Sequence, residues 1–159
     1  MIRILFVCHG NICRSPMAEF YMKDLVKKEH RSNQFHIESA ATTSEEIWLG
    51  RGNPIYPPAL KQLQAHGIGT ADNELGVHEK SARLIKEEDY DSFDLLIGMD
   101  EENIVMMKAK WNDTSHKIHL LLDYAGLHRD VADPWYTRNF KAAWDDIALG
   151  CDALYQSLQ

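Results

Sequence analysis

The segment from Cys8 to Pro16 holds the residues of this chain that are best suited to chemistry. It reads Cys-His-Gly-Asn-Ile-Cys-Arg-Ser-Pro, and it lies between the largely apolar run Ile2–Val7 and a stretch with helical spacing. If residues 9–14 curl around a point ahead of that helix, their backbone N–H groups converge there and the helix dipole adds positive potential. Gly10 permits the backbone angles of such a curl. The segment therefore predicts an anion-binding loop.

Two side chains of this loop, Cys8 and Arg14, indicate phosphate chemistry. A planar guanidinium binds two phosphate oxygens at once. The loop lacks the Gly-Lys-Ser/Thr ending of a nucleotide-binding loop, so a phosphate monoester fits it better than a nucleotide. The donors that attract phosphate also favour a thiolate at Cys8, which would then act as a nucleophile. A cysteine six residues before an arginine is weak evidence by itself, because cysteine is often a small buried apolar residue.

Short apolar runs of strand length alternate along the chain with longer stretches of helical periodicity. The runs are Ile2–Val7, Phe35–Ala40, Leu95–Met99 and Ile118–Leu122. Helices are expected behind a Ser15 cap with Pro16 in the first turn, from Pro58 to His66, after Asp100, and from Phe140 to Leu158. This alternation predicts an α/β fold with parallel strands and helices on both faces of the sheet. Because such sheets bind ligands beyond the carboxyl ends of their strands, the loop after the first strand is the expected site.

Length and charge narrow the class of protein. A chain of 159 residues, of which 45% are hydrophobic, predicts one domain with a sizeable core. The formal net charge of -7 argues against a general affinity for nucleic acid or for anionic membranes. The apolar run near the start is too short for a membrane span and lacks the small-residue cleavage site of a leader, so we expect a cytoplasmic protein. Three cysteines is an odd number, which leaves at least one thiol free.

The string Cys8-x5-Arg14-Ser15, placed between the first strand and the first helix, resembles the signature of the low-molecular-weight protein tyrosine phosphatase family. The resemblance implies one domain over residues 1–159, with a four-stranded parallel sheet of flavodoxin-like order 2-1-3-4. It implies hydrolysis of phosphotyrosine in proteins and of small aryl phosphates through a phosphocysteine intermediate, without cofactor or metal. The expected partners are phosphotyrosine-containing proteins and phosphate-like oxyanions such as vanadate and sulfate. A monomer is expected, with a weak dimer as the alternative.

Members of that family also carry an Asp-Pro-aromatic motif near the C-terminus, and Asp133-Pro134-Trp135-Tyr136 matches it. An Asp-Pro pair alone is most often just a turn. Under the resemblance Asp133 protonates the leaving oxygen, which typically contributes ~10²–10⁴-fold to the rate, and it later activates water. Ser15 donates to the cysteine sulfur. The phosphate is held by the loop residues His9, Gly10, Asn11, Ile12, Cys13 and Arg14.

The resemblance further assigns supporting residues around the loop. Asn11 would be held by hydrogen bonds to Ser39 and His78. The region of His78 is longer than the family pattern at residues 72–79, and a surface histidine in an irregular loop is the alternative. Cys13 would close a reversible disulfide with Cys8, and a plain packing role is the alternative.

Substrate-binding residues also follow from the resemblance. Trp48, Trp135 and Tyr136 are expected to grip the phosphotyrosine ring, and packing in the core is the alternative for each of them. Ile12 favours phosphotyrosine, because relatives that act on phosphoarginine carry threonine at that position.

Two other functions remain open at this point. A thiol-dependent arsenate reductase shares the fold, but it needs two further cysteines, and only Cys151 remains, on the apolar face of the last helix. A non-catalytic phosphotyrosine-binding module would keep the loop and lose the nucleophile or the acid. A metal site is not expected, because His116 and His119 would point to opposite faces of a strand, and Cys8 and Cys13 lack a second ligand pair.

Overall fold

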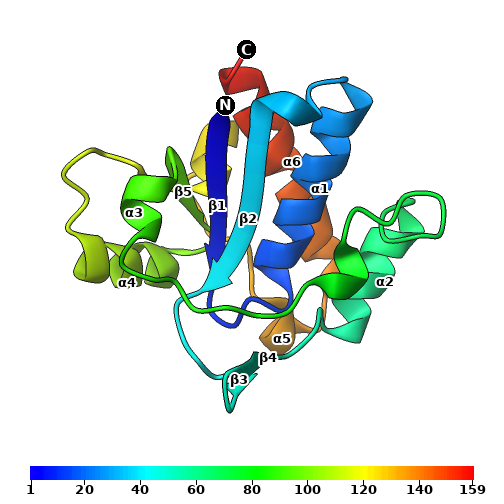
Figure 1. Cartoon of the computed structure of the whole chain (residues 1–159), viewed down its shortest axis with the longest axis horizontal. Helices are drawn as coiled ribbons and strands as arrows, with labels where there is room; N and C mark the ends of the chain where they lie inside the picture. Colours follow the sequence, from blue (N-terminus) through cyan, green and yellow to red (C-terminus); the bar gives the residue numbers. More distant parts are fainter.

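The computed structural model describes residues 1–159, and its main sheet has four parallel strands. The order across the sheet is β2-β1-β5-β6. The strands β3 and β4 form a separate hairpin. When only the four strands of the main sheet are numbered in chain order, their order is the expected 2-1-3-4, and the predicted α/β fold is confirmed (Figure 1). The strands are β1 (Ile2–Cys8), β2 (Phe35–Ala41), β5 (Leu95–Gly98) and β6 (Ile118–Leu120).

The side chains of β1 alternate between the two faces of the sheet and so build two apolar layers. Ile4 and Phe6 belong to the larger cluster, together with residues of three helices: α1 (Arg14–Lys28), α2 (Pro57–Ala65) and α6 (Phe140–Ser157). Leu5 and Val7 face the other side, where they join residues of α3 (Asp89–Ser92) and α4 (Glu101–Trp111). Because β1 is buried on both faces, its sequence is an almost continuous apolar run.

The predicted helices are present, with shifts at their ends. α1 begins at Arg14, with Cys13 in the cap position, so the prediction that Ser15 caps this helix is wrong. The Ser15 hydroxyl contacts the Cys8 sulfur instead of the helix backbone. Asp100 caps α4 as expected, since its Oδ1 accepts the Asn103 N–H at 2.8 Å. None of the helices has both the length and the apolar composition that a membrane span requires.

The remaining elements are short and lie outside the main sheet. An antiparallel hairpin of β3 (Ile47–Trp48) and β4 (Arg51–Gly52) lies between β2 and α2 in the chain. A one-turn helix, α5 (Pro134–Thr137), follows the Asp-Pro pair. The 3-10 turns are Ser32–Gln34, Val77–Glu79 and Leu121–Ala125.

The segments that follow the carboxyl ends of the strands meet at one edge of the sheet. The arrowheads of β1 and β2 point toward the end of the molecule where β3, β4 and α5 lie (Figure 1). Backbone hydrogen bonds join these segments: Thr42 N donates to Cys8 O at 3.0 Å, and Val131 N donates to Met99 O at 2.9 Å. This edge is where a parallel sheet places its ligand site.

Candidate active site

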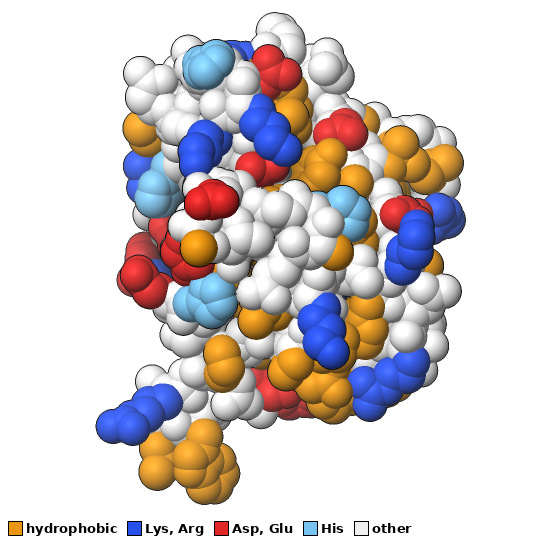
Figure 2. All heavy atoms as spheres, turned by 90° about the vertical axis from the view of Figure 1, so that its right-hand side faces the viewer, with side chains coloured by type: hydrophobic (Ala, Val, Ile, Leu, Met, Phe, Trp, Pro, Cys, Tyr) orange, Lys and Arg blue, Asp and Glu red, His pale blue; other side chains and the backbone are white.

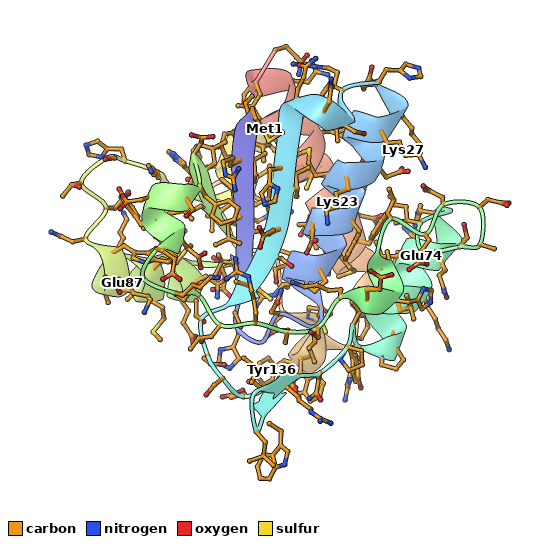
Figure 3. The ribbon with its side chains drawn as sticks, in the orientation of Figure 1. Met1, Lys23, Lys27, Glu74, Glu87 and Tyr136 are labelled. Atoms are coloured by element: carbon orange, nitrogen blue, oxygen red, sulfur yellow. The ribbon has the colours of Figure 1, made fainter.

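A cleft of about 110 Å³ opens at this edge of the sheet. It brings together the thiol of Cys8, the guanidinium of Arg14 and the carboxylate of Asp133, which the sequence separates widely. Figure 3 shows Tyr136 at the same end of the molecule, between the loop after β1 and the β3–β4 hairpin. The lining residues are Cys8, His9, Gly10, Ile12, Cys13, Arg14, Glu45, Glu46, Asp133, Trp135 and Tyr136.

The sulfur of Cys8 lies where β1 ends, against the first turn of α1. It accepts a hydrogen bond from Ser15 N at 3.4 Å and lies 3.0 Å from Ser15 Oγ. Asn11 Nδ2 donates to the same Ser15 oxygen at 2.8 Å, so the hydroxyl hydrogen is free to point at sulfur. The helix terminus and these two donors all stabilise negative charge on sulfur.

Arg14 is almost fully buried and is held by three oxygens. Its Nη1 donates to Asp100 Oδ2 at 2.7 Å and to Val131 O at 2.9 Å, and its Nη2 donates to Asp133 Oδ2 at 3.3 Å. Burial opposes the charged guanidinium, but Cys8, Asp133 and Asp100 outweigh it and raise the pKa of Arg14 above its ordinary value. The side chain is therefore charged and fixed in orientation.

Asp133 reaches the cleft from the N-terminus of α5. Its Oδ1 caps that helix by accepting the Trp135 N–H at 3.0 Å, and Pro134 supplies the first helical residue. The side chain of Asp133 remains partly exposed to solvent. Trp135 packs on Tyr56 with ring centroids 5.0 Å apart, which fixes one side of the cleft. A local cap and an aromatic contact thus hold the carboxyl at the mouth of the loop.

Asn11 ties the loop to its neighbours from a buried position. Its φ of 61° lies in the left-handed region, which asparagine tolerates better than most residues. Its Nδ2 donates to Ser39 Oγ at 2.9 Å, which is the hydrogen bond that the family resemblance implies. Its Oδ1 accepts the backbone N–H of Arg83 at 3.1 Å. These two hydrogen bonds of the Asn11 side chain hold the loop against neighbouring segments.

The structure contradicts the expected hydrogen bond between Asn11 and His78. His78 is largely exposed in the turn Val77–Glu79, and its Nδ1 lies 2.7 Å from Glu74 Oε2. The extra residues of this segment bond to one another and to α1, as when Asn73 Nδ2 donates to Asp24 Oδ1 at 2.9 Å. His78 therefore stays with its own loop, and the backbone of Arg83 takes the place that was assigned to it.

Two residues near Asn11 are absent from the sequence prediction: Glu19, which is buried, and Lys80, which is partly buried. Glu19 accepts hydrogen bonds from Ser39 Oγ and from Lys23 Nζ, and Lys80 Nζ lies 3.6 Å from its Oε1. Lys80 also donates to Ser39 O at 2.8 Å. Burial lowers the pKa of Lys80, although Glu19 opposes the shift. The spacing of Glu19 and Lys23 on α1 is a sequence signal for a pair, whereas nothing in the sequence marks Lys80.

Asp100 is a further residue of the site that the sequence analysis used only as a helix start. It follows β5 directly, and its two oxygens serve different partners, with Oδ1 on the α4 backbone and Oδ2 on Arg14. The position of Asp100 in the sequence could have identified it as a site residue, because a carboxylate just past the carboxyl end of a parallel strand lies at the edge of the sheet where ligands bind.

The expectation that Trp48 forms a wall of the cleft is wrong. Trp48 belongs to β3 and is 77% exposed, and it is not among the residues that line the cleft. The chain reaches the cleft just before the hairpin instead, through Glu45 and Glu46, and Glu45 Oε2 lies 2.8 Å from His9 Nε2. Trp135 and Tyr136 do line the cleft, as does Ile12.

The three thiols are all free, and they differ in their surroundings. Burial is the largest cause that raises the pKa of the Cys13 thiol far above its ordinary value, and the neighbouring Cys8 is the second largest. Burial also raises the pKa of Cys151, which lies in α6 with its Sγ 3.9 Å from Ala18 O. Both groups are therefore protonated thiols at neutral pH.

Comparison with known proteins places this site in a family. A family profile described as low molecular weight phosphotyrosine protein phosphatase matches residues 3–159. The chain belongs to this family.

Individual relatives cover the chain from end to end. The low molecular weight protein-tyrosine-phosphatase YfkJ of Bacillus subtilis is 40% identical over 163 residues, which is 100% of this chain and 97% of the relative. The low molecular weight phosphotyrosine protein phosphatase of Gallus gallus is 34% identical and covers 96% of this chain and 93% of its own.

The crystal structure of YfkJ superposes with a TM-score of 0.88 at 36% identity, covering 100% of this chain and 95% of that one. The family resemblance inferred from Cys8-x5-Arg14 is confirmed across the whole length of the chain. This family membership identifies the chain as an enzyme of the phosphatase class.

Proposed function

We propose that this chain hydrolyses phosphotyrosine in proteins, and small aryl phosphates, through a phosphocysteine intermediate on Cys8. The observation that carries the proposal is the convergence of a thiol, a guanidinium and a carboxyl group in one cleft, at the N-terminus of α1. The names of the relatives support the same reaction, since they are called protein-tyrosine phosphatases.

In the first step the Cys8 thiolate attacks phosphorus and the bond to the phenolic oxygen breaks as the P–S bond forms. Arg14 and the backbone amides of residues 9–14 hold the three equatorial oxygens, where charge is concentrated in the transition state. Asp133 gives its proton to the leaving oxygen, so that tyrosine departs neutral. The hydrogen bonds of Arg14 Nη1 to Asp100 Oδ2 and to Val131 O hold the guanidinium in place during this step.

In the second step water attacks phosphorus on the side that the tyrosine has left. Asp133, now ionised, takes a proton from this water, and the P–S bond breaks to release phosphate and the Cys8 thiolate. The Ser15 hydroxyl lies 3.0 Å from Sγ, and its hydrogen bond stabilises the thiolate as it departs. One carboxyl group thus serves as acid and then as base.

The walls of the cleft favour an aromatic phosphate ester. Trp135 and Tyr136 stand on one side and Ile12 lines the loop, which gives apolar surface around the position of a phenolic ring. The thiol lies at the end of β1 and is 3% exposed, so the ester must reach down to it. A phosphotyrosine side chain is longer than a phosphoserine side chain and suits this depth.

The alternative functions find less support. An arsenate reductase needs two relay cysteines besides the nucleophile, and Cys151 is fully buried in α6. A non-catalytic phosphotyrosine-binding module would lack the nucleophile or the acid, whereas Cys8, Arg14 and Asp133 all line the cleft. A reactive thiolate must also stay reduced, so we place the protein in a reducing compartment such as the cytoplasm.

The test is hydrolysis of para-nitrophenyl phosphate by the wild-type chain and two variants. Cys8→Ser removes the nucleophile and should abolish turnover, with no phosphoenzyme trapped on rapid quenching. Asp133→Ala should lower kcat by ~10²–10⁴-fold for a phosphotyrosine peptide, and by less for para-nitrophenyl phosphate, whose leaving group is already a good one. Vanadate should inhibit competitively, because it mimics the five-coordinate phosphorus. Unchanged turnover by the Cys8→Ser variant would exclude the proposed mechanism.

A further inference from the structure

The turn that carries Asp133 has few attachments to the rest of the molecule. We call residues 133–138 the Asp133 turn. Pro134 is its one buried residue. Two side-chain hydrogen bonds join the turn to segments that are distant in sequence: Arg14 Nη2 donates to Asp133 Oδ2 at 3.3 Å, and Arg138 Nη1 donates to Tyr56 Oη at 3.2 Å. The position of the turn therefore depends in part on Arg138.

Arg138 stands at a backbone position that favours glycine. It follows the last residue of α5, and its φ of 59° lies in the left-handed region. Glycine is the usual residue where a helix ends in this conformation, because a Cβ is strained there. The chain accepts that strain and gains an arginine side chain. A role for the guanidinium accounts for the choice.

The Arg138 side chain holds two aromatic rings together. Its guanidinium carbon lies 5.3 Å from the centre of the Trp135 ring, a distance at which a cation is attracted to an aromatic face. Trp135 packs on Tyr56 with ring centroids 5.0 Å apart, and the Tyr56 hydroxyl accepts the hydrogen bond from Arg138. On the face drawn in Figure 2, Lys and Arg side chains lie directly against apolar groups in the lower part of the body, at the level of α2 and α5 in Figure 1. We call Tyr56, Trp135 and Arg138 the clamp.

The clamp connects the acid to the phosphate loop. On one side the backbone N–H of Trp135 donates to Asp133 Oδ1 at 3.0 Å. On the other side the backbone N–H of Tyr56 donates to the carbonyl oxygen of Ile12 at 2.9 Å. Holding Trp135 against Tyr56 therefore fixes the distance between the carboxyl group and the loop that binds phosphate.

We propose that Arg138 is a positioning residue for the proton transfer by Asp133. It acts through Trp135, whose backbone N–H holds the carboxyl group within reach of the leaving oxygen. A general acid works only at hydrogen-bond distance from the atom that it protonates, so a small displacement of the turn slows this step. The inference rests on the proposed function.

The test uses two esters with the same ring and different leaving groups, phenyl phosphate and para-nitrophenyl phosphate. Phenolate is the poorer leaving group, so its departure depends more on the proton from Asp133. For Arg138→Gly, the ratio of kcat/KM for phenyl phosphate to kcat/KM for para-nitrophenyl phosphate should fall by roughly three- to tenfold. A change in ring binding alone would lower both values equally and leave the ratio unchanged.

Stability measurements separate positioning from unfolding. Glycine suits the left-handed φ, so the unfolding midpoint of Arg138→Gly should stay the same or rise while the ratio falls. Arg138→Lys keeps a cation that can reach the Trp135 ring but loses the planar fork, so its ratio should lie between those of the wild type and the glycine variant.

The chain offers a matched control in Arg31. Its Nη1 donates to Tyr155 Oη at 3.4 Å, and its guanidinium carbon lies 5.7 Å from the centre of the Tyr155 ring. These contacts are of the same kind, but Arg31 precedes the start of β2 and so lies at the end of the sheet away from the cleft. Arg31→Gln should keep the wild-type ratio.

A double variant tests whether Arg138 acts through Asp133. Asp133→Asn should lower the ratio by itself, because an amide cannot supply the proton. Adding Arg138→Gly to Asp133→Asn should lower the ratio no further, since the two residues serve the same step.

Three outcomes would overturn the inference while the proposed function stands. They are an unchanged ratio in Arg138→Gly, an equal fall of the ratio in Arg31→Gln, and a further fall when Arg138→Gly is added to Asp133→Asn. If Asp133→Asn alone left the ratio unchanged, or if neither ester were cleaved by the wild-type chain, the proposed mechanism itself would be refuted, and the inference with it.

Discussion

The loop of residues 8–15 and the arm, which is the β3–β4 hairpin of residues 47–52, lie at the same end of the molecule and are built in opposite ways. The loop buries polar groups: Asn11, Arg14 and Ser15 are all nearly inaccessible. Asn11 and Arg14 have hydrogen-bond partners from distant parts of the chain, and Ser15 bonds within the loop. The arm exposes apolar groups, and its internal hydrogen bonds are local. Substitutions in the loop should therefore destabilise the protein, whereas substitutions in the arm should have little effect on stability.

The difference shows which of the two regions depends on buried polar contacts. Charge stabilisation needs donors that are already oriented, so the loop is locked from behind by Ser39, Glu19 and Lys80. The arm has no such set of buried donors, and its large side chains Trp48 and Leu49 are mostly exposed to solvent. Substitutions in the two regions should accordingly affect different quantities.

The largest effect is expected from Arg14→Lys. Lysine keeps the charge but loses the planar fork that contacts Asp100 and Asp133 and that holds phosphate in the proposed mechanism, so kcat should fall by ~10²–10³-fold. Steady-state kinetics with para-nitrophenyl phosphate measures this. Arg129→Lys, on the surface pair with Asp146, is the matched control and should retain activity. Equal activity of the two variants would refute the role of Arg14.

Asn11→Ala should destabilise the fold as well as the site. It leaves buried partners unsatisfied, at a cost of about 1–3 kcal/mol, and places alanine at a positive φ, which costs about 1 kcal/mol more. Urea unfolding measures the free energy. Asn11→Gly removes the same hydrogen bonds but relieves the backbone strain, so it should be the more stable of the two. An unchanged midpoint in both variants would show that the loop is not locked as described.

The thiols should react in a fixed order with iodoacetamide at neutral pH. The thiolate is the reactive form, and burial raises the pKa of Cys13 and Cys151, so both should be alkylated at least about tenfold more slowly than Cys8. Labelling of Cys13 should increase as the pH is raised, because its thiol then begins to ionise. Peptide mapping by mass spectrometry measures each site. Equal alkylation rates at Cys8 and Cys13 would contradict the assignment of Cys8 as the reactive thiolate.

The smallest effect is expected from Trp48→Ala. Because the side chain is mostly exposed, the free energy of unfolding should change by less than about 0.5 kcal/mol, in contrast to Asn11→Ala. Thermal and urea unfolding measure it. A loss comparable to that of Asn11→Ala would mean that the arm is part of the structural framework, and the contrast between the two regions would fail.

Much of the site was predictable because its signals are local. The loop chemistry follows from contiguous residues between a strand and a helix, and the carboxyl-end rule for parallel sheets places it at the ligand edge. Asp133 was found through the adjacent Pro-Trp-Tyr and the resemblance to the family. His78 was assigned by the same resemblance, and the assignment failed because the longer segment 72–79 bonds to itself and to α1.

The sequence by itself determined the alternation of elements and the chemistry of residues 8–15, because apolar periodicity and backbone donors act over a few neighbouring residues. Only the tertiary structure decided that Asp133 meets Arg14 across 119 residues, that Lys80 lies against Glu19, and that Trp48 points into solvent. Such contacts depend on how two distant segments pack, and the composition of neither segment specifies that packing.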